Sequence, residues 1–138
     1  MKDETQVRKN ELLEKLRAVL SARKEIVFAY AHGSFLDGGA FRDIDLAVFV
    51  DPSHALGSDR FDYAFALAVD LTKEIGHDID VQVLNGASTG FQNSVFKTGK
   101  VLFSRNEQIR LDLLETNSQE TMDFHELSLE YIRECAGR

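Results

Sequence analysis

The sequence has few of the residues and patterns that mark secreted, membrane-spanning or repetitive proteins. Its 138 residues include one cysteine, Cys135, and one proline, Pro52. A single cysteine excludes an internal disulfide framework and suits a reducing compartment. No apolar run approaches the length of a membrane span, and the first residues lack the apolar core of a signal peptide. Since the sequence also has no repeat, linker or low-complexity segment, we expect one cytoplasmic domain over residues 1–138 that does not contact a membrane.

Basic residues are outnumbered by acidic ones. Sixteen Lys and Arg against 23 Asp and Glu give a net charge of −7, which disfavours a large nucleic-acid interface. A nucleotide is still compatible with this charge, because a bound metal ion can invert the field of a carboxylate cluster. A basic protein partner would also suit an acidic surface.

The spacing of hydrophobic residues predicts alternating helices and strands. The third predicted strand, residues 78–84, has one polar and one apolar face, which is typical of a sheet that helices cover on one side. In the helix at 59–75, a stripe facing the core is expected to hold Phe61, Ala64, Phe65, Ala68, Leu71 and Ile75. The expected strands are residues 26–31, 44–50, 78–84 and 101–103, which places the core sheet within 26–103. The expected helices are residues 3–22, 59–75, 88–96 and a C-terminal helical segment at 105–136.

A Gly33-Ser34 step follows the first predicted strand directly. Glycine allows the backbone to approach a phosphate closely, and the hydroxyl and backbone N–H groups can donate to its oxygens. The step is therefore a candidate phosphate-binding turn, although Gly-Ser also occurs in purely structural turns. We interpret the neighbouring Tyr30 and Phe35 as packing residues rather than surfaces for base stacking, and His32 as a structural residue at the strand end rather than a phosphate contact.

Two carboxylates, Asp43 and Asp45, stand at the start of the second predicted strand. Side chains alternate along a strand, so these two point to the same face and repel each other. Magnesium prefers oxygen ligands and commonly combines one or two carboxylates with substrate phosphates. The pair therefore predicts a magnesium site beside the Gly33-Ser34 turn.

The third predicted strand adds Asp78 and Asp80 on its polar face. If this strand neighbours the second, one of them completes a cluster of three carboxylates. Such a cluster can hold two metal ions about 3.5–4 Å apart, one of which activates a nucleophile. The alternative is that both residues belong to a solvated strand face.

These motifs together resemble those of the nucleotidyltransferase superfamily of DNA polymerase β. The matching residues are Gly33-Ser34, Asp43-Ile44-Asp45-Leu46 and Asp80-Val81. The chain is most similar to the minimal nucleotidyltransferases, small single domains with a Gly-Ser…Asp-x-Asp signature, and the resemblance covers nearly its whole length. It implies an α+β fold with a small mixed sheet packed on one face by helices. It also makes Asp80, rather than Asp78, the third carboxylate.

The resemblance implies an enzyme that transfers AMP from ATP to a hydroxyl. Asp43 and Asp45 would bind Mg²⁺, as one or two ions together with Asp80, while Gly33 and Ser34 would hold the phosphates. Asp80 would position or deprotonate the attacking hydroxyl. Relatives of this kind are often antitoxins that transfer AMP to a tyrosine of a HEPN-family toxin, which implies a HEPN partner here. Both homo- and hetero-oligomers are compatible with the sequence.

The segment between Ser34 and Asp43 departs from the family pattern. It is shorter than usual, and it carries Asp37 near a position where the family commonly has an arginine. A carboxylate there would repel phosphates, although Arg42 could compensate. These differences favour an alternative in which the chain neutralises a toxin by binding alone. A transferase acting on a small molecule, such as an aminoglycoside, is a further alternative.

Overall fold

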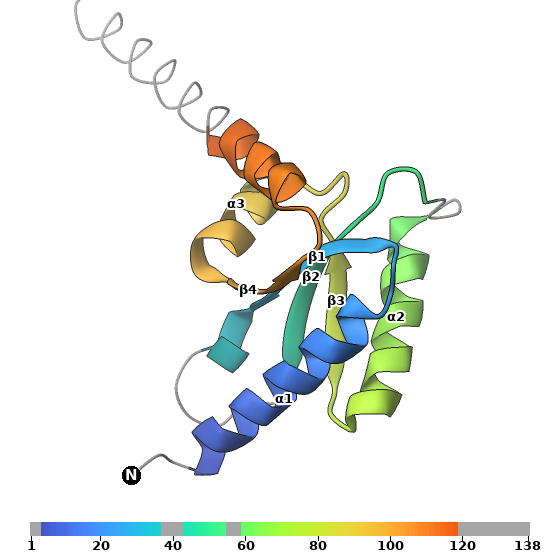
Figure 1. The fold of residues 1–138 in the computed structure, drawn as a ribbon, viewed down its shortest axis with the longest axis vertical. Coiled ribbons are helices and arrows are strands. Elements are labelled where there is room, and N and C mark those ends of the chain that lie inside the picture. The colour runs from blue at the N-terminus through green and yellow to red at the C-terminus, as the bar shows by residue number, and fades with distance from the viewer. Residues whose placement is uncertain (1–3, 37–42, 55–58, 119–138) are drawn as a thin grey trace, which may run out of the picture. The chain divides into compact units, whose positions relative to one another are not determined.

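The structure, a computed structural model, describes residues 4–36, 43–54 and 59–118 (Figure 1). The chain divides into two units, residues 1–106 and residues 107–138. The first unit contains the sheet and all of the candidate site residues. In the second unit, the described residues 107–118 are helical. None of the helices in the described part of the chain is long and apolar enough to span a membrane.

The first unit is built on a four-stranded sheet in the order β3-β2-β1-β4. β1 pairs antiparallel with both β2 and β4, whereas β2 and β3 are parallel. This mixed sheet with its helices confirms the expected α+β class. The strands are β1 (Ile26–His32), β2 (Ile44–Val50), β3 (Ile79–Val83) and β4 (Lys100–Ser104). The helices are α1 (Glu4–Ser21), the 3-10 turn η1 (Gly33–Leu36), α2 (Arg60–Ile75) and α3 (Thr89–Thr98).

The predicted element boundaries agree with these bounds to within about two residues, and local capping signals mark the helix ends. The Asp59 side chain caps α2, and Gly76 ends that helix at a φ of +76°. Ser88 caps α3 through the backbone N–H of Phe91. The predicted C-terminal helix agrees over residues 107–118, while residues 119–136 of that prediction lie outside the described residues.

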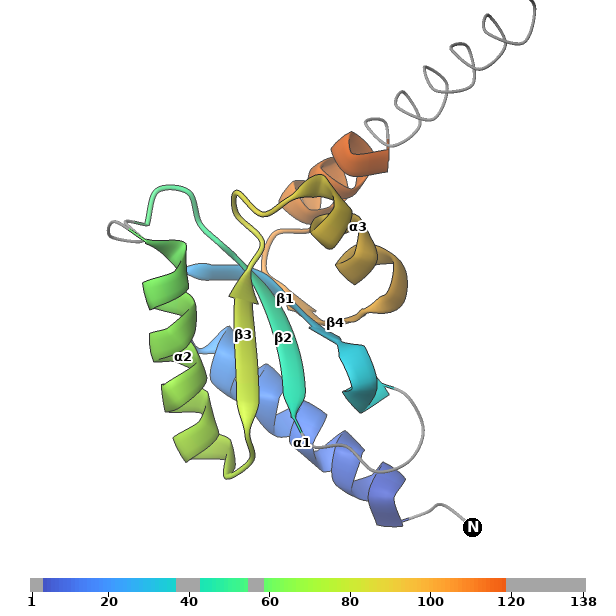
Figure 2. The same ribbon diagram turned by 180° about the vertical axis from the view of Figure 1, so that it is seen from behind.

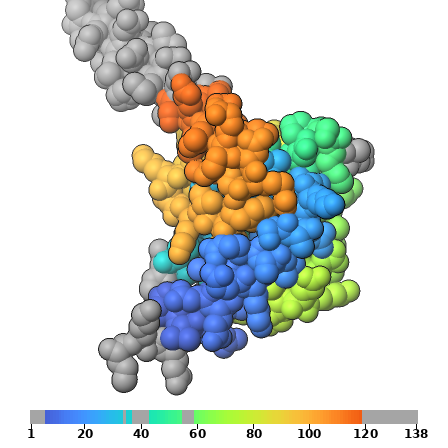
Figure 3. Space-filling view, viewed as in Figure 1, coloured from blue at the N-terminus to red at the C-terminus, as the bar shows by residue number. Residues whose placement is uncertain are grey.

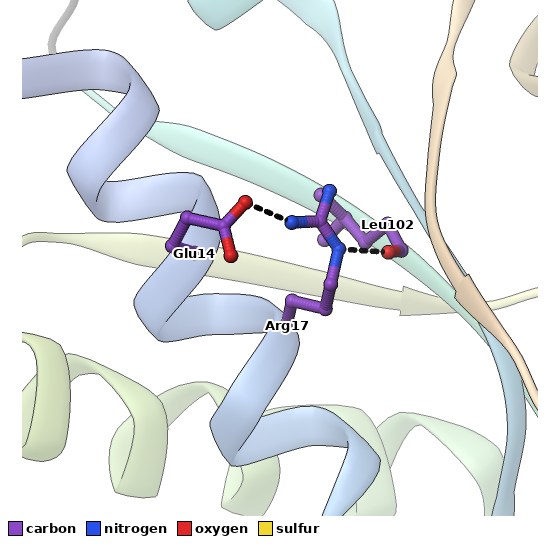
Figure 4. A network of polar contacts seen from close by, with 3 residues as sticks. All are labelled: Glu14, Arg17 and Leu102. Atoms are coloured by element: carbon purple, nitrogen blue, oxygen red, sulfur yellow. Dashed lines mark hydrogen bonds and ion pairs between the residues drawn. The ribbon is translucent and has the colours of Figure 1, made fainter. Parts of the chain in front are cut away.

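One face of the sheet is covered by α1 and α2. In Figure 1, α1 crosses in front of the strands and α2 stands beside β3. The space-filling view from the same side shows α1 spread over this face (Figure 3). Arg17 of α1 also reaches β4, since its Nε donates to the Leu102 carbonyl at 2.5 Å while Nη1 pairs with Glu14 (Figure 4). The helix side chains in this core are Leu12, Leu13, Leu16, Leu20, Ala64, Leu67, Leu71 and Ile75.

The predicted core stripe of α2 is wrong at two positions. Phe61 and Phe65 are 67% and 73% exposed, whereas Leu67, which the predicted stripe left out, is buried. The helix is turned so that the stripe through Ala64, Leu67 and Leu71 faces the sheet. Spacing alone favoured the phenylalanines because they also recur at three- and four-residue steps.

The opposite face of the sheet is only partly covered. There α3 lies over β1 (Figure 2). Phe96 packs against Phe28 and Tyr30, with ring centroids 6.4 and 5.4 Å apart. Phe49 stacks on Phe28 at 5.2 Å and extends this aromatic cluster onto β2. On this side of β3 the alternate side chains Asp80 and Gln82 are exposed. Acidic side chains of β2 and β3 are therefore presented beside the aromatic cluster.

Candidate active site

Three neighbouring strands place His32, Asp45 and Asp80 in one row across the open face. His32 of β1 is opposite Asp45 of β2, and Asp45 is level with Asp80 of β3. Asp43 is exposed just before β2 and is close enough to raise the pKa of Asp45. The three candidate carboxylates therefore lie near one another, and the condition for such a cluster, that the second and third strands are neighbours, is met.

The candidate phosphate turn lies directly against this row. Gly33 begins η1 with a φ of +81°, a conformation that L side chains rarely adopt. A Cβ atom added at Gly33 would collide with Oδ2 of Asp45. Glycine is thus favoured here by its backbone conformation, and an added Cβ would also displace the Asp45 carboxylate. Ser34 follows within the same turn, whereas Asp37 and Arg42 lie outside the described residues.

The electrostatics of Asp45 favour a cation. Burial raises the pKa of this carboxyl above its ordinary value; His32 opposes the increase, while the charges of Asp80 and Asp43 add to it. Three carboxylates close together are destabilising unless a positive charge offsets them. An ionised Asp45 is unfavourable in the protein alone. A divalent cation would offset both the cost of burying its charge and the repulsion from Asp43 and Asp80.

The available donors fit magnesium better than a softer metal. The candidate ligands Asp43, Asp45 and Asp80 offer only carboxylate oxygens, which a hard cation prefers. Among the described residues, no three His, Cys, Asp or Glu side chains already form a metal-binding group. Magnesium sites at phosphates are commonly incomplete in this sense, since waters and the substrate complete the shell.

His32, which the sequence favours as a structural residue at a strand end, is a member of this site. Its ring lies edge-on to Phe91, with centroids 5.9 Å apart, and its buried Nε2 has no hydrogen-bond partner in the described part of the chain. Burial lowers the pKa of His32, while Asp45, the Leu46 backbone and Asp80 raise it in part. Its place beside Gly33 was visible in the sequence, but its register with Asp45 was not.

Tyr30 and Phe35 are packing residues, as the sequence predicts. Tyr30 is 2% exposed within the aromatic cluster, and Phe35 is 1% exposed within the core. The Nζ atom of Lys9 lies 5.6 Å from the centroid of the Phe35 ring. Neither aromatic ring is thus presented as a surface on which a base could stack.

A groove of about 540 Å³ begins at Asp80 and continues toward α2 and the start of α3. Its walls are mainly apolar and include the two exposed phenylalanines of α2. Because helical spacing favours a core position for both phenylalanines, the groove is not predicted from the sequence. The lining residues are Arg60, Phe61, Ala64, Phe65, Ala68, Asp80, Val81, Gln82, Val83, Ala87, Ser88 and Phe91.

A mixed sheet with clustered carboxylates beside a glycine turn is the arrangement expected of nucleotidyl transfer. The sequence matches the family model "Polymerase beta, Nucleotidyltransferase" over residues 14–108. The chain therefore belongs to the polymerase beta nucleotidyltransferase family. No curated protein matches the sequence closely enough to count as a relative.

Similar solved structures come from toxin–antitoxin complexes. One contains a tri-AMPylated HEPN toxin of Shewanella oneidensis with an MNT antitoxin (20% identity, TM-score 0.66, covering 91% of this chain and 97% of that chain). Another is the toxin–antitoxin MntA-HepT (21%, 0.60, covering 94% and 97%). A third is a toxin–antitoxin with AMP-PNP (26%, 0.64, covering 83% and 90%). The first two likenesses establish the fold alone.

Proposed function

We propose that this protein is a magnesium-dependent adenylyltransferase that transfers AMP from ATP to a hydroxyl, a tyrosine of a HEPN-family partner, and acts as its antitoxin. The observation that carries the proposal is the register of Asp45 with Asp80, together with the contact of Gly33 with the Asp45 carboxylate. It brings a candidate phosphate turn and the predicted carboxylates to one place. We assign the reaction to the cytoplasm, in keeping with the single cysteine.

Each residue of the site has a role in this reaction. Gly33 and Ser34 hold the β- and γ-phosphates of ATP through the turn after β1. Asp43 and Asp45 would hold Mg²⁺, with Asp80 available to a second ion, and the metal would supply positive charge that offsets the charge of the phosphates. Asp80, exposed on β3, orients the acceptor hydroxyl and accepts its proton.

The bond changes balance without any further reactant. The acceptor oxygen forms a bond to the α-phosphorus of ATP, and the bond from that phosphorus to the oxygen bridging to the β-phosphate breaks. Pyrophosphate leaves with the bonding electrons, and the hydroxyl proton passes to a carboxylate and then to water. Catalysis of this kind consists mainly of positioning and charge stabilisation.

The assignment of a protein acceptor is supported by the similar structures, which are complexes of an antitoxin with a toxin protein. One of them pairs an MNT antitoxin with a tri-AMPylated HEPN toxin, and this chain covers 97% of the matched chain; another is the toxin–antitoxin MntA-HepT. The toxin–antitoxin with AMP-PNP supports use of an adenine nucleotide. These are properties of those proteins, and we extend them to this chain as part of the proposal.

The test is a transfer assay with ATP labelled at the α-phosphate. The protein is incubated with Mg²⁺ and the HEPN-family protein encoded beside its gene, in parallel with the Asp43→Ala/Asp45→Ala variant. Label on the partner with the wild type only is the expected result. Neutralisation of the toxin by both proteins without label would favour the binding module suggested by Asp37, and label on an aminoglycoside alone would favour a small-molecule transferase.

A further inference from the structure

The groove beside Asp80 is unusual because it exposes large aromatic side chains. Phe61 and Phe65 are 67% and 73% exposed, and both line the groove on its α2 side. Phe91 of α3 and the polar Gln82 of β3 complete much of the remaining wall. Contiguous exposed apolar surface next to polar residues is typical of a binding site, and the volume lies within the usual range of about 300–1,000 Å³ for such sites.

The order of the strands gives the groove a definite position relative to the phosphate turn. Gly33 follows β1 on one side of Asp45, and Asp80 lies on β3 at the other side. The phosphate turn and the groove therefore lie at opposite ends of the row of His32, Asp45 and Asp80. In nucleotidyl transfer the attacking and leaving oxygens lie roughly in line on opposite sides of the phosphorus. A leaving pyrophosphate held at Gly33 thus requires the acceptor to approach from the side of Asp80.

We propose that this groove binds the segment of the partner protein that carries the acceptor tyrosine, and that Phe61 and Phe65 are its main contacts. The inference rests on the proposed function and adds the surface that delivers the acceptor. Its support is the continuity of the groove with the candidate catalytic row, since Asp80 belongs to both. A tyrosine that packs against these phenylalanines presents its hydroxyl to a carboxylate at the groove's end.

The charges around the groove define the kind of segment that fits. At one end Asp80 is joined by Asp43 and Asp45, so an acidic segment would be repelled there. At the start of α2, the groove is lined by the positively charged Arg60. Its guanidinium lies 5.0 Å from the centroid of the Phe61 ring, and its Nη1 donates to the Asn85 carbonyl at 3.3 Å. The occupant is therefore an apolar, aromatic segment that is neutral or basic around its tyrosine.

Removal of the aromatic side chains tests this inference. In the Phe61→Ser/Phe65→Ser variant we expect the KM for the HEPN-family partner to rise by about tenfold or more, because aromatic contacts carry much of the binding energy at interfaces. The affinity for Mg·AMP-PNP, measured by calorimetry, remains unchanged. Val69→Ser is the matched control, because Val69 is a 37% exposed apolar residue of the same helix outside the groove. Circular dichroism and thermal unfolding verify that all variants fold.

A photo-crosslinker at position 65 identifies the occupant directly. Benzoylphenylalanine in place of Phe65 should crosslink to the partner peptide that contains the adenylylated tyrosine, and the same group at Val69 should not. A crosslink to a second copy of this chain, or labelling of the groove by azido-ATP, would overturn the inference. If the wild type transfers no label, the proposed function fails; if it transfers label and the double variant matches it, only the groove assignment fails.

Discussion

The backbone at Gly33 lies directly against the Asp45 carboxylate. Replacement by alanine forces an L side chain into a φ of +81° and places its Cβ against Asp45. The conformation alone costs about 1–2 kcal/mol. We expect Gly33→Ala to exceed that loss in urea denaturation, since the Asp45 carboxylate must also move, and to lose transfer activity.

Gly76 provides the matched control for this change. Its φ of +76° is nearly the same, but an added Cβ has no atom within 4 Å. Gly76→Ala should therefore show the conformational cost of about 1–2 kcal/mol and no loss of transfer. Equal destabilisation by the two variants, with activity kept in both, would contradict the contact between Gly33 and Asp45.

We expect the ionised Asp45 carboxylate to lower the free energy of unfolding of the metal-free protein. Burial and the neighbouring carboxylates raise its pKa in the folded protein, so the ionised form destabilises the fold at neutral pH without metal. This destabilisation is complete above the folded pKa and disappears as the pH falls below the unfolded pKa. Asp45→Asn should therefore unfold at a higher temperature than the wild type at pH 7 in EDTA, and the gain should vanish in acid.

The same substitution should abolish transfer. A metal contributes several kcal/mol to a transition state of this kind and each 1.4 kcal/mol is tenfold, so we expect a loss of about a thousandfold. Asp78→Asn changes an exposed carboxylate before β3 and should alter stability by less than about 0.5 kcal/mol. A destabilised Asp45→Asn protein at pH 7 would contradict the interpretation of Asp45.

At the scale of elements, Asn85 joins the end of β2 to the turn after β3. Its Oδ1 accepts from the Val50 N–H at 2.9 Å, and its Nδ2 donates to the Val50 carbonyl at 2.7 Å. Asn85→Ala leaves both backbone groups without these bonds and should lower the free energy of unfolding by about 1–3 kcal/mol in urea denaturation. Asn85→Asp keeps the acceptor but not the donor and should lose less. An alanine variant as stable as the wild type would show that water replaces both bonds.

The elements themselves were largely predictable because their signals are local. Alternation set β3, and the caps at Asp59, Gly76 and Ser88 set the ends of α2 and α3. The approach of Asp45 to Asp80 could be predicted only on the condition that their two strands are neighbours in the sheet. Strand order is decided by long-range packing, and the family resemblance rather than the periodicity pointed to Asp80.

The rotation of α2 shows where sequence reasoning reached its limit. Two overlapping stripes on that helix satisfy helical spacing. The spacing alone favours the more aromatic stripe, which includes Phe61 and Phe65, as the one that faces the core. The structure buries the stripe through Ala64, Leu67 and Leu71 instead. A core of fixed volume accepts small and aliphatic side chains under the sheet, and Phe61 and Phe65 are left outside to line the groove. The feature that sequence reasoning missed is thus the one that we assign to acceptor binding.

At the scale of the whole molecule, the acidic surface means that nucleotide binding depends on the metal. With a net charge of −7 and the three carboxylates at the site, ATP alone meets repulsion, whereas its magnesium complex does not. We therefore expect AMP-PNP to stabilise the protein against thermal unfolding only when Mg²⁺ is present. At a ligand concentration of about 100 Kd the expected stabilisation is about 2.7 kcal/mol.

This stabilisation separates loss of binding from loss of chemistry. For a domain of this size, 2.7 kcal/mol corresponds to a rise in Tm of about 5–15 °C, which a thermal shift assay resolves readily. The Asp43→Ala/Asp45→Ala variant should show no such rise, and the Phe61→Ser/Phe65→Ser variant should show all of it. A wild type that responds neither to AMP-PNP nor to its magnesium complex would indicate that the fold serves binding to a partner alone, because a nucleotidyltransferase must first hold its nucleotide.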